Sequence, residues 1–133
     1  MPIFESTEQM YDVLGTVLSS ITEDAVVSKK FNNKNINVRF VYNNPSGEIW
    51  VLHGEDEPSV VTGPTDVKAD IEMWISGDDA HLFWLKKLNL PVAITKRKVK
   101  SKGPTTKVLA LLPMLKPAYA KYPAICKEKG IPV

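Results

Sequence analysis

The most constraining feature of this chain is a series of short segments between residues 36 and 76 in which apolar side chains recur at every second position. The segments at 36–42 and 68–76 alternate most regularly, and those at 48–53 and 59–62 are shorter. Such alternation is typical of strands with one buried face, and the intervening Asn, Pro and Gly residues indicate turns. The pattern predicts consecutive antiparallel strands whose buried face is covered by helices.

Helical spacing of apolar residues flanks this strand region. Six side chains in residues 6–21 recur three or four positions apart, and they predict an amphipathic helix: Met10, Val13, Leu14, Val17, Leu18 and Ile21. A second helix is expected to begin at 77–79 with an aspartate as its N-cap. Asn89 should end that helix, and Pro91 should open a short one after it.

Prolines limit the helices in the last third of the chain. A strand at 98–102 and a turn at 103–104 should lead into a helix with the apolar stripe Val108, Leu111, Leu112 and Leu115. Pro113 lacks a backbone donor and clashes with the preceding turn, so the helix should end or kink just before it. Pro117 and Pro123 are expected to divide the remainder into short helical pieces.

These patterns together predict an α+β fold, with a five-stranded, mainly antiparallel sheet and helices covering one face. The chain has 133 residues, of which 44% are hydrophobic and 24% are charged. This composition suits a single domain over residues 1–133 with one core.

Charge is distributed unevenly along the sequence. Residues 1–85 contain 5 Lys or Arg against 14 Asp or Glu, whereas residues 86–133 contain 12 against 1. A basic cluster near the strand at 98–102 comprises Lys96, Arg97, Lys98, Lys100 and Lys102. It fits contact with an anionic lipid head group or membrane surface. It equally fits a solvated edge strand, on which lysines deter edge pairing, and the two halves of the chain could also cancel in space. No pattern in it favours nucleic-acid binding.

Residues able to carry out chemistry are few and scattered. His53 and His81 lack the spacing of metal ligands, and Cys126 is the only cysteine. Asp78 and Asp79 fit a helix cap better than an acid–base pair. The sequence therefore predicts no catalytic residue, metal site or cofactor, and we do not expect an enzyme.

The sequence also lacks the usual signals for membranes and export. No apolar run approaches the roughly 18 residues of a membrane span. The first residues do not combine a basic region with an apolar one as signal peptides do. With a single cysteine, the expected location is the reducing cytoplasm.

Five short segments occur in a recognisable order: ADIEM at 69–73, DDAHLF at 78–83, KLN at 87–89, KVKSKG at 98–103 and ALLPML at 110–115. In this order they resemble the sterol carrier protein 2 (SCP2)-like lipid-transfer domains. The resemblance covers about residues 6–116 and leaves 117–133 as a short helical tail. Lys86 stands where that family usually has glycine.

The resemblance implies an apolar tunnel between sheet and helices. It would bind a fatty acid, acyl-CoA, phospholipid or sterol without catalysis. An apolar wall suits such ligands, because each methylene group buried in it contributes about 0.8 kcal/mol to binding. The side chains expected to line it are Trp50, Leu52, Ile71, Met73, Ile75, Phe83, Trp84, Leu88, Ile94, Val108, Leu111, Leu112 and Leu115. The implied partner is a lipid or fatty-acyl ligand, with transient contact to an anionic membrane, and the protein would be a monomer or homodimer.

The same apolar stripes also fit ordinary core packing. In that alternative the side chains fill the tunnel, and the domain serves as an accessory or protein-interaction module that has kept the fold. A small enzyme is the remaining class, and the sequence offers it no acid, base and nucleophile in one pattern.

Overall fold

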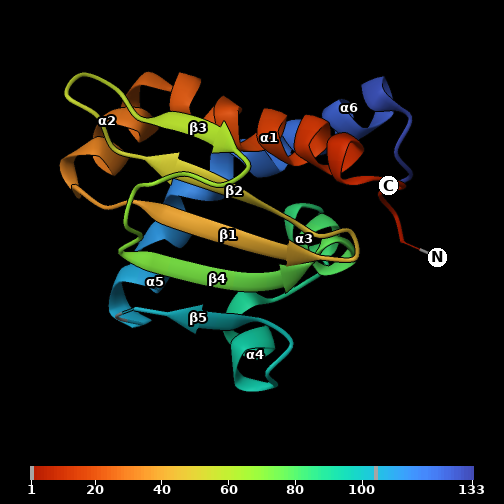
Figure 1. Cartoon of the computed structure of the whole chain (residues 1–133). Coiled ribbons are helices and arrows are strands. Elements are labelled where there is room, and N and C mark those ends of the chain that lie inside the picture. The colour runs from red at the N-terminus through yellow and green to blue at the C-terminus, as the bar shows by residue number, and fades with distance from the viewer. Residues whose placement is uncertain (1, 104) are drawn as a thin grey trace.

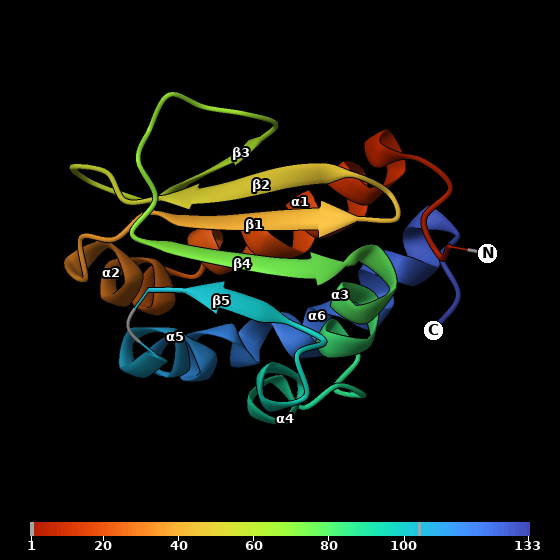
Figure 2. The same cartoon turned by 60° about the horizontal axis from the view of Figure 1, so that its bottom comes forward.

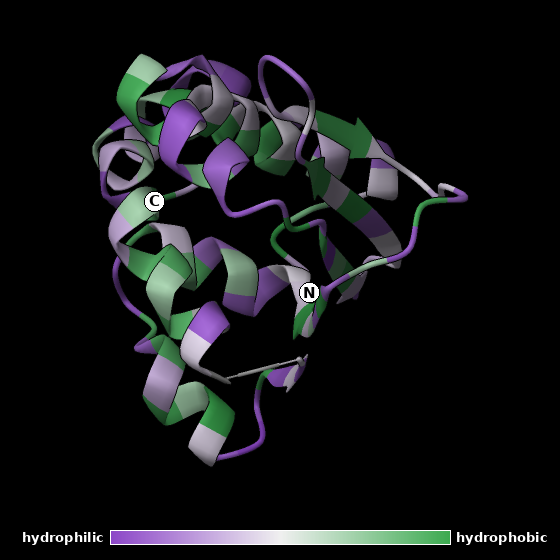
Figure 3. Ribbon diagram, turned by 90° about the vertical axis from the view of Figure 1, so that its left-hand side faces the viewer, coloured by the Kyte–Doolittle hydropathy of each residue, from purple (hydrophilic) through white to green (hydrophobic). Residues whose placement is uncertain are grey.

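The computed structural model describes residues 2–103 and 105–133, including every side chain of these except those of Thr105 and Val108. Helices lie on one side of a five-stranded sheet (Figure 1, and edge-on in Figure 3, with the helices to the left of the strands). The predicted α+β class is therefore confirmed. In chain order the elements are α1 (Thr7–Glu23), α2 (Ala25–Asn33), β1 (Val38–Asn43), β2 (Gly47–Leu52), β3 (Ser59–Thr62), β4 (Ile71–Ser76), α3 (Gly77–Trp84), α4 (Leu90–Thr95), β5 (Lys100–Lys102), α5 (Thr105–Leu111), the 3₁₀ turn η1 (Leu112–Leu115) and α6 (Lys116–Lys129).

The strand order is β3-β2-β1-β4-β5, with one parallel pair, β1 and β4, among antiparallel neighbours. The expectation of consecutive antiparallel pairing is therefore wrong at the step from β3 to β4. Asn37 and Asp70 fix β4 beside β1, since the Asn37 N–H donates to Asp70 Oδ2 at 2.7 Å and the Asp70 N–H donates to the Asn37 carbonyl at 2.8 Å. The connection 63–70 crosses in front of the sheet to make this pairing possible (Figure 1).

The register decides which side chains face the helices. Val38 lies opposite both Val51 and Ile71, and Phe40 and Tyr42 continue the same face along β1. We call this the inner face. The alternating apolar residues of β4 are also on it and are buried: Ile71, Met73 and Ile75.

On the outer face of the sheet, Arg39 joins three strands. Its Nη2 donates to Glu48 on β2 at 2.8 Å, and its Nη1 donates to Glu72 on β4 at 2.9 Å. The guanidinium also lies 5.7 Å from the ring centroid of Trp50, whose Nε1 donates to Glu48 at 2.8 Å. The Glu48 side chain is 18% exposed and that of Glu72 is 21% exposed, so this ion-pair network is better shielded than a surface pair.

The first helix confirms its predicted stripe, because all six apolar residues are buried. α1 packs on β2, β3, α2 and α6. Its N-terminus is capped by Ser6, whose side chain accepts from the Gln9 N–H. Asp24 caps α2 in the same way.

The expectation that prolines would divide the region after residue 116 is wrong, because α6 runs unbroken to Lys129. Pro117 lies in its first turn, where no intrahelical donor is needed. Pro123 lies inside the helix but on its exposed side. The opposite side buries Ala118, Tyr122 and Cys126, and this packing maintains the helix despite the missing hydrogen bond.

Pro113 behaves as predicted. α5 ends at Leu111, and the chain tightens into η1 with Pro113 in its first half. The predicted turn before α5 includes Pro104, which lies outside the described residues.

Candidate functional site

Two small cavities lie between the inner face of the sheet and the helices. The first has a volume of about 60 Å³ and is lined by Leu18, Phe40, Tyr42, Met73, Ile75, Ala80, Phe83, Trp84, Leu90, Leu111, Leu112 and Leu115. The second has a volume of about 30 Å³ and is lined by Leu18, Ile21, Phe31, Val38, Phe40, Val51, Leu111, Met114 and Leu115. Only two of these lining side chains carry a polar atom: Tyr42 has a hydroxyl group and Trp84 has an indole N–H.

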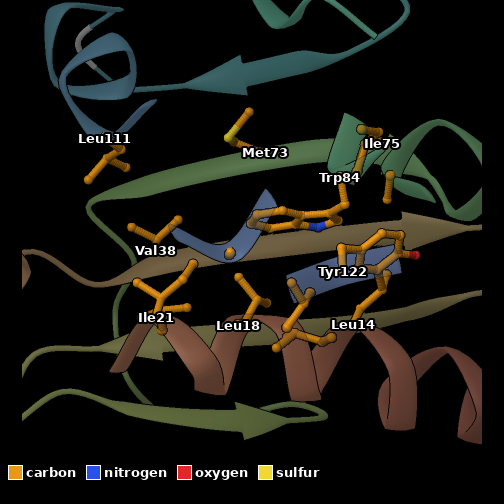
Figure 4. Packing of buried hydrophobic residues seen from close by; sticks show 14 of the residues in the cluster. Leu14, Leu18, Ile21, Val38, Met73, Ile75, Trp84, Leu111 and Tyr122 are labelled. Carbon is orange, nitrogen blue, oxygen red and sulfur yellow. The ribbon is translucent and has the colours of Figure 1, made fainter. Parts of the chain in front are cut away.

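Four side chains are shared by both cavities and stand between them: Leu18, Phe40, Leu111 and Leu115. Figure 4 shows Leu18 and Ile21 pointing from α1 toward Val38, with Leu111 on the α5 side. The continuous tunnel of the sequence-based expectation is thus divided in the described structure. Small-molecule sites usually enclose about 300–1,000 Å³, so a ligand requires these side chains to move.

α5 contributes few buried side chains to the wall among those that the structure describes. Among the α5 side chains that the structure describes, only Leu111 is buried, at 8% exposed, while Leu109 is 40% exposed. The main contacts of α5 are with its chain neighbour η1 and with β5. Displacement of α5 would therefore break fewer packing contacts than displacement of α1 or α6.

A surface groove lies against the first cavity, and we call it the lysine groove. Its volume is about 680 Å³, and it is lined by Phe83, Lys86, Lys87, Leu88, Asn89, Leu90, Pro91, Leu109, Leu112, Pro113, Lys116 and Tyr119. Figure 2 shows the helices that form it: α4 and α5 lie below β5, and α3, which contacts α6, lies at the arrowhead end of β4. Phe83, Leu90 and Leu112 line both the groove and the first cavity, so they separate the two spaces.

Seven of the predicted tunnel residues line the first cavity: Met73, Ile75, Phe83, Trp84, Leu111, Leu112 and Leu115. Leu88 lies in the lysine groove. Ile71 is fully buried on the inner face, and Ile94 packs against the core, but neither lines a cavity. The side chain of Val108 lies outside the described residues. Ligand contact by these side chains stays a prediction.

The predicted tunnel lining is wrong for Trp50 and Leu52, because the structure places both on the outer face of the sheet, away from the helices. Trp50 pairs with Arg39 across the β1–β2 register, and Leu52 follows it two positions later on the same face. Residues 49–52 are all apolar, so their sequence does not indicate which of them face the helices. The register of pairing with β1 decides this, and it places Ile49 and Val51 on the inner face instead.

Other lining residues were not among the predicted tunnel residues. Leu18 and Ile21 belong to the α1 stripe, and Val38, Phe40 and Tyr42 to the alternating segment at 36–42. Those patterns predicted burial, but burial alone does not tell a cavity wall from a filled core. Ala80, Leu90, Phe31, Val51 and Met114 complete the lining.

The predicted basic cluster does not line the groove. Lys96, Arg97, Lys98, Lys100 and Lys102 are all exposed, and Lys100 and Lys102 lie opposite Trp74 and Glu72 on the outer face. The basic residues that do line the groove are Lys86, Lys87 and Lys116. Lys116 is distant in the chain from Lys86 and Lys87, so only the fold brings the three together and no local pattern indicates the group.

A buried polar cluster ties both chain ends to α3. His81 is 2% exposed, with Nδ1 2.7 Å from the Tyr122 hydroxyl and Nε2 2.8 Å from the Pro132 carbonyl. Because a carbonyl only accepts, the neutral ring carries its proton on Nε2 and accepts from Tyr122. The prediction of an aspartate cap for α3 is wrong, because Ser76 caps the helix and Asp78 Oδ1 instead accepts from the Ile3 N–H at 2.8 Å.

This cluster gives a pH prediction. Burial lowers the pKa of His81, so the unfolded chain binds a proton more readily than the folded protein does. The stability that neutral His81 confers is fully present above about pH 6.5, the ordinary histidine value, and is lost as pH falls toward the lower folded pKa. We expect His81→Asn to lower the free energy of unfolding by about 1–2 kcal/mol at pH 7.5. It should also flatten the dependence on pH between 7.5 and 5, measured by urea unfolding, with His53→Asn as control. An unchanged slope in His81→Asn would contradict this.

The structure offers little for other chemistry within the residues it describes. No three His, Cys, Asp or Glu side chains there are grouped so as to hold a metal ion. Burial raises the pKa of the Cys126 thiol, which disfavours the reactive thiolate. None of the described helices is both long and apolar enough to cross a membrane.

Solved structures with a similar fold include several sterol carrier proteins. The sterol carrier protein domain 2 of Helicoverpa armigera matches with a TM-score of 0.64 at 19% identity, over 83% of this chain and 91% of that chain. The apo form of sterol carrier protein 2 from Yarrowia lipolytica matches with a TM-score of 0.62 at 21% identity, over 78% of this chain and 88% of that chain. Palmitated SCP2L2 from Aedes aegypti matches with a TM-score of 0.56 at 14% identity, over 75% of this chain and 91% of that chain. This protein therefore has an SCP2-like fold.

A domain of this fold also occurs within a larger enzyme. A double mutant of a sec-alkyl sulfatase matches with a TM-score of 0.58 at 20% identity over 65% of this chain, which spans only 14% of that chain. No family model matches the sequence, and no curated protein matches it. The likeness is one of fold.

Proposed function

We propose that this protein binds and carries a hydrophobic ligand of the fatty acid, acyl-CoA, phospholipid or sterol class, without catalysis. The observation that supports this most is the pair of apolar cavities on the inner face of the sheet, which share four lining side chains. An open groove beside the first cavity gives such a ligand a route from solvent.

The geometry favours an acyl chain among these ligands. The two cavities are small and share Leu111 and Leu115 in their walls, so outward movement of these side chains would join them into one space. A linear chain can occupy that space methylene by methylene, and each buried methylene contributes about 0.8 kcal/mol toward displacing the wall. A rigid sterol would require a wider opening at a single place.

The fold supports the same assignment by analogy. The Aedes aegypti structure of this fold is a palmitated protein, so a C16 acyl chain is the natural first probe here.

A specific observation also favours the second candidate, a module that keeps the fold with its tunnel filled. The cavities are about 60 and 30 Å³, well below ordinary ligand sites. In that case the domain would act through its surface as an accessory or protein-interaction module.

The cellular setting belongs to the proposal as well. We place the carrier in the cytoplasm, where the single, buried Cys126 would remain reduced. The exposed basic cluster at Lys96, Arg97, Lys98, Lys100 and Lys102 would make transient contact with anionic membranes during lipid exchange.

Extraction separates the two candidates. We expect protein purified under native conditions to release a hydrophobic small molecule into organic solvent, at up to one equivalent per chain by mass spectrometry. We also expect palmitate to displace a fluorescent fatty acid from the delipidated protein. An empty extract together with no fluorescent binding would reject the carrier and favour the filled module.

A further inference from the structure

We propose that the lysine groove is the subsite for the anionic head of the bound chain, so that the ligand is a single-chain amphiphile with a carboxylate or phosphate-type end. This inference rests on the proposed function and adds the chemical class of the ligand and its direction in the site. The tail would occupy the two cavities, and the head would lie in the groove.

The position of the groove supports this orientation. Phe83, Leu90 and Leu112 are the only separation between the groove and the first cavity among the described lining residues. A chain that passes between these side chains emerges directly among the lysines. The groove is also much larger than the first cavity, about 680 against 60 Å³, so it can hold a polar group bulkier than the chain.

The charge of the groove fits an anion. Its described lining contains Lys86, Lys87 and Lys116 but no carboxylate. None of the three takes part in an ion pair within the described residues, where the basic partners in ion pairs are Arg39 and Lys129. Three uncompensated ammonium groups around one groove repel one another, and an anion bound among them relieves that repulsion.

Lys86 occupies a backbone position that favours a different residue. It follows the C-terminal end of α3 with φ at 65°, in the left-handed region that glycine adopts most easily. Its N–H donates to the Phe83 carbonyl at 3.0 Å, which closes the helix end. The turn therefore gains nothing from the lysine side chain, which instead places Nζ 5.7 Å from the Tyr119 ring centroid inside the groove.

Lys116 is likewise not explained by its helix. It is the first residue of α6, where a positive charge opposes the helix dipole. Its side chain is exposed at the groove. Lys86 and Lys116 thus come from separate elements and converge on one space, which supports a shared anionic partner.

The test compares three C16 probes that differ only in the head: palmitate, hexadecyl phosphate and hexadecanol. Each is titrated at low salt, below its aggregation concentration, against a bound fluorescent fatty acid. The variants are Lys86→Gly, the triple variant Lys86→Gly/Lys87→Ser/Lys116→Ser, and a matched control that removes three exposed α2-side charges, Lys29→Ser/Lys30→Ser/Lys34→Ser.

We expect the native protein to bind the two anionic probes about tenfold or more tightly than hexadecanol. Lys86→Gly should lower the affinity for the anionic probes about threefold while thermal stability is kept or raised, because glycine relieves the left-handed backbone. The triple variant should remove most of the preference, with hexadecanol affinity unchanged. The α2 control should retain the preference.

The outcomes separate the two proposals. Equal affinity of the native protein for all three probes would overturn the head-group subsite and leave the carrier function intact. Loss of preference in the α2 control as well as in the triple variant would also overturn it, because the effect would then come from net charge alone. Binding of no probe at all would overturn the carrier function itself. A preference for the phosphate over the carboxylate would identify the head.

Discussion

Replacing Leu111 with tryptophan is expected to lower the affinity for palmitate at least tenfold while the protein still folds. Leu111 lines both cavities and is 8% exposed, so a larger side chain there fills the space that a ligand chain must enter. Overpacking at such a site costs about 1–3 kcal/mol of stability, which a domain of this size tolerates. Fluorescent fatty-acid displacement and thermal unfolding measure the two effects separately.

The matched control changes the neighbouring residue on the same helix. Ala110 is exposed and lines neither of the two cavities, so Ala110→Trp adds the same indole to α5 outside them, and palmitate affinity should stay near that of the native protein. The opposite change, Leu111→Ala, should keep binding while lowering the free energy of unfolding by about 2–4 kcal/mol. Unchanged affinity in Leu111→Trp would show that Leu111 is ordinary core and that the ligand, if any, binds elsewhere.

Replacing Arg39 with methionine is expected to lower the free energy of unfolding by about 2 kcal/mol. Methionine keeps much of the apolar stem but leaves Glu48 and Glu72 without their shared cation on neighbouring strands. Breaking a fully buried pair costs about 3–5 kcal/mol, and partial exposure of both carboxylates reduces that figure here. Urea unfolding at pH 7 measures the loss.

The pH dependence gives this variant its own signature. The hydrogen bond from Arg39 lowers the pKa of Glu48 below its ordinary value of 4.5. The stability from this pairing is therefore fully present above about pH 4.5 and is lost as pH falls through the lower folded pKa. Arg39→Met should lose this acid-dependent component. Lys129→Met, which breaks a pair with the 60% exposed side chain of Asp12, should cost no more than about 0.5 kcal/mol, and an equal loss in both variants would argue against a special role for Arg39.

The fold could be predicted wherever local periodicity was unambiguous. The α1 stripe and the alternation at Ile71, Met73 and Ile75 each report a single face, and the structure confirms both. The pairing of β4 with β1 could not be predicted in this way, because it depends on contacts such as that between Asn37 and Asp70, 33 residues apart.

The candidate site was predictable only in part, for a related reason. Met73 and Leu111 could be placed on apolar faces, but whether such faces enclose a space depends on how several elements pack. Trp50 shows the weakness of a continuous apolar run, since only register turns it outward. Lys86 and Lys116 share a groove because α3 and α6 meet, which neither local sequence indicates.

The packing of α6 on α1 has a consequence for how the chain acquires its structure. The Lys129 ammonium lies 2.9 Å from Asp12, a contact that joins residues 117 positions apart. During synthesis α1 emerges well before α6, so the part of its apolar stripe that packs on α6 has no partner until α6 has been made. Contacts of such long range slow folding, so the nascent chain would expose apolar surface on α1 until α6 is available to cover it. A chain shortened before residue 116 should aggregate on release rather than form a smaller stable domain.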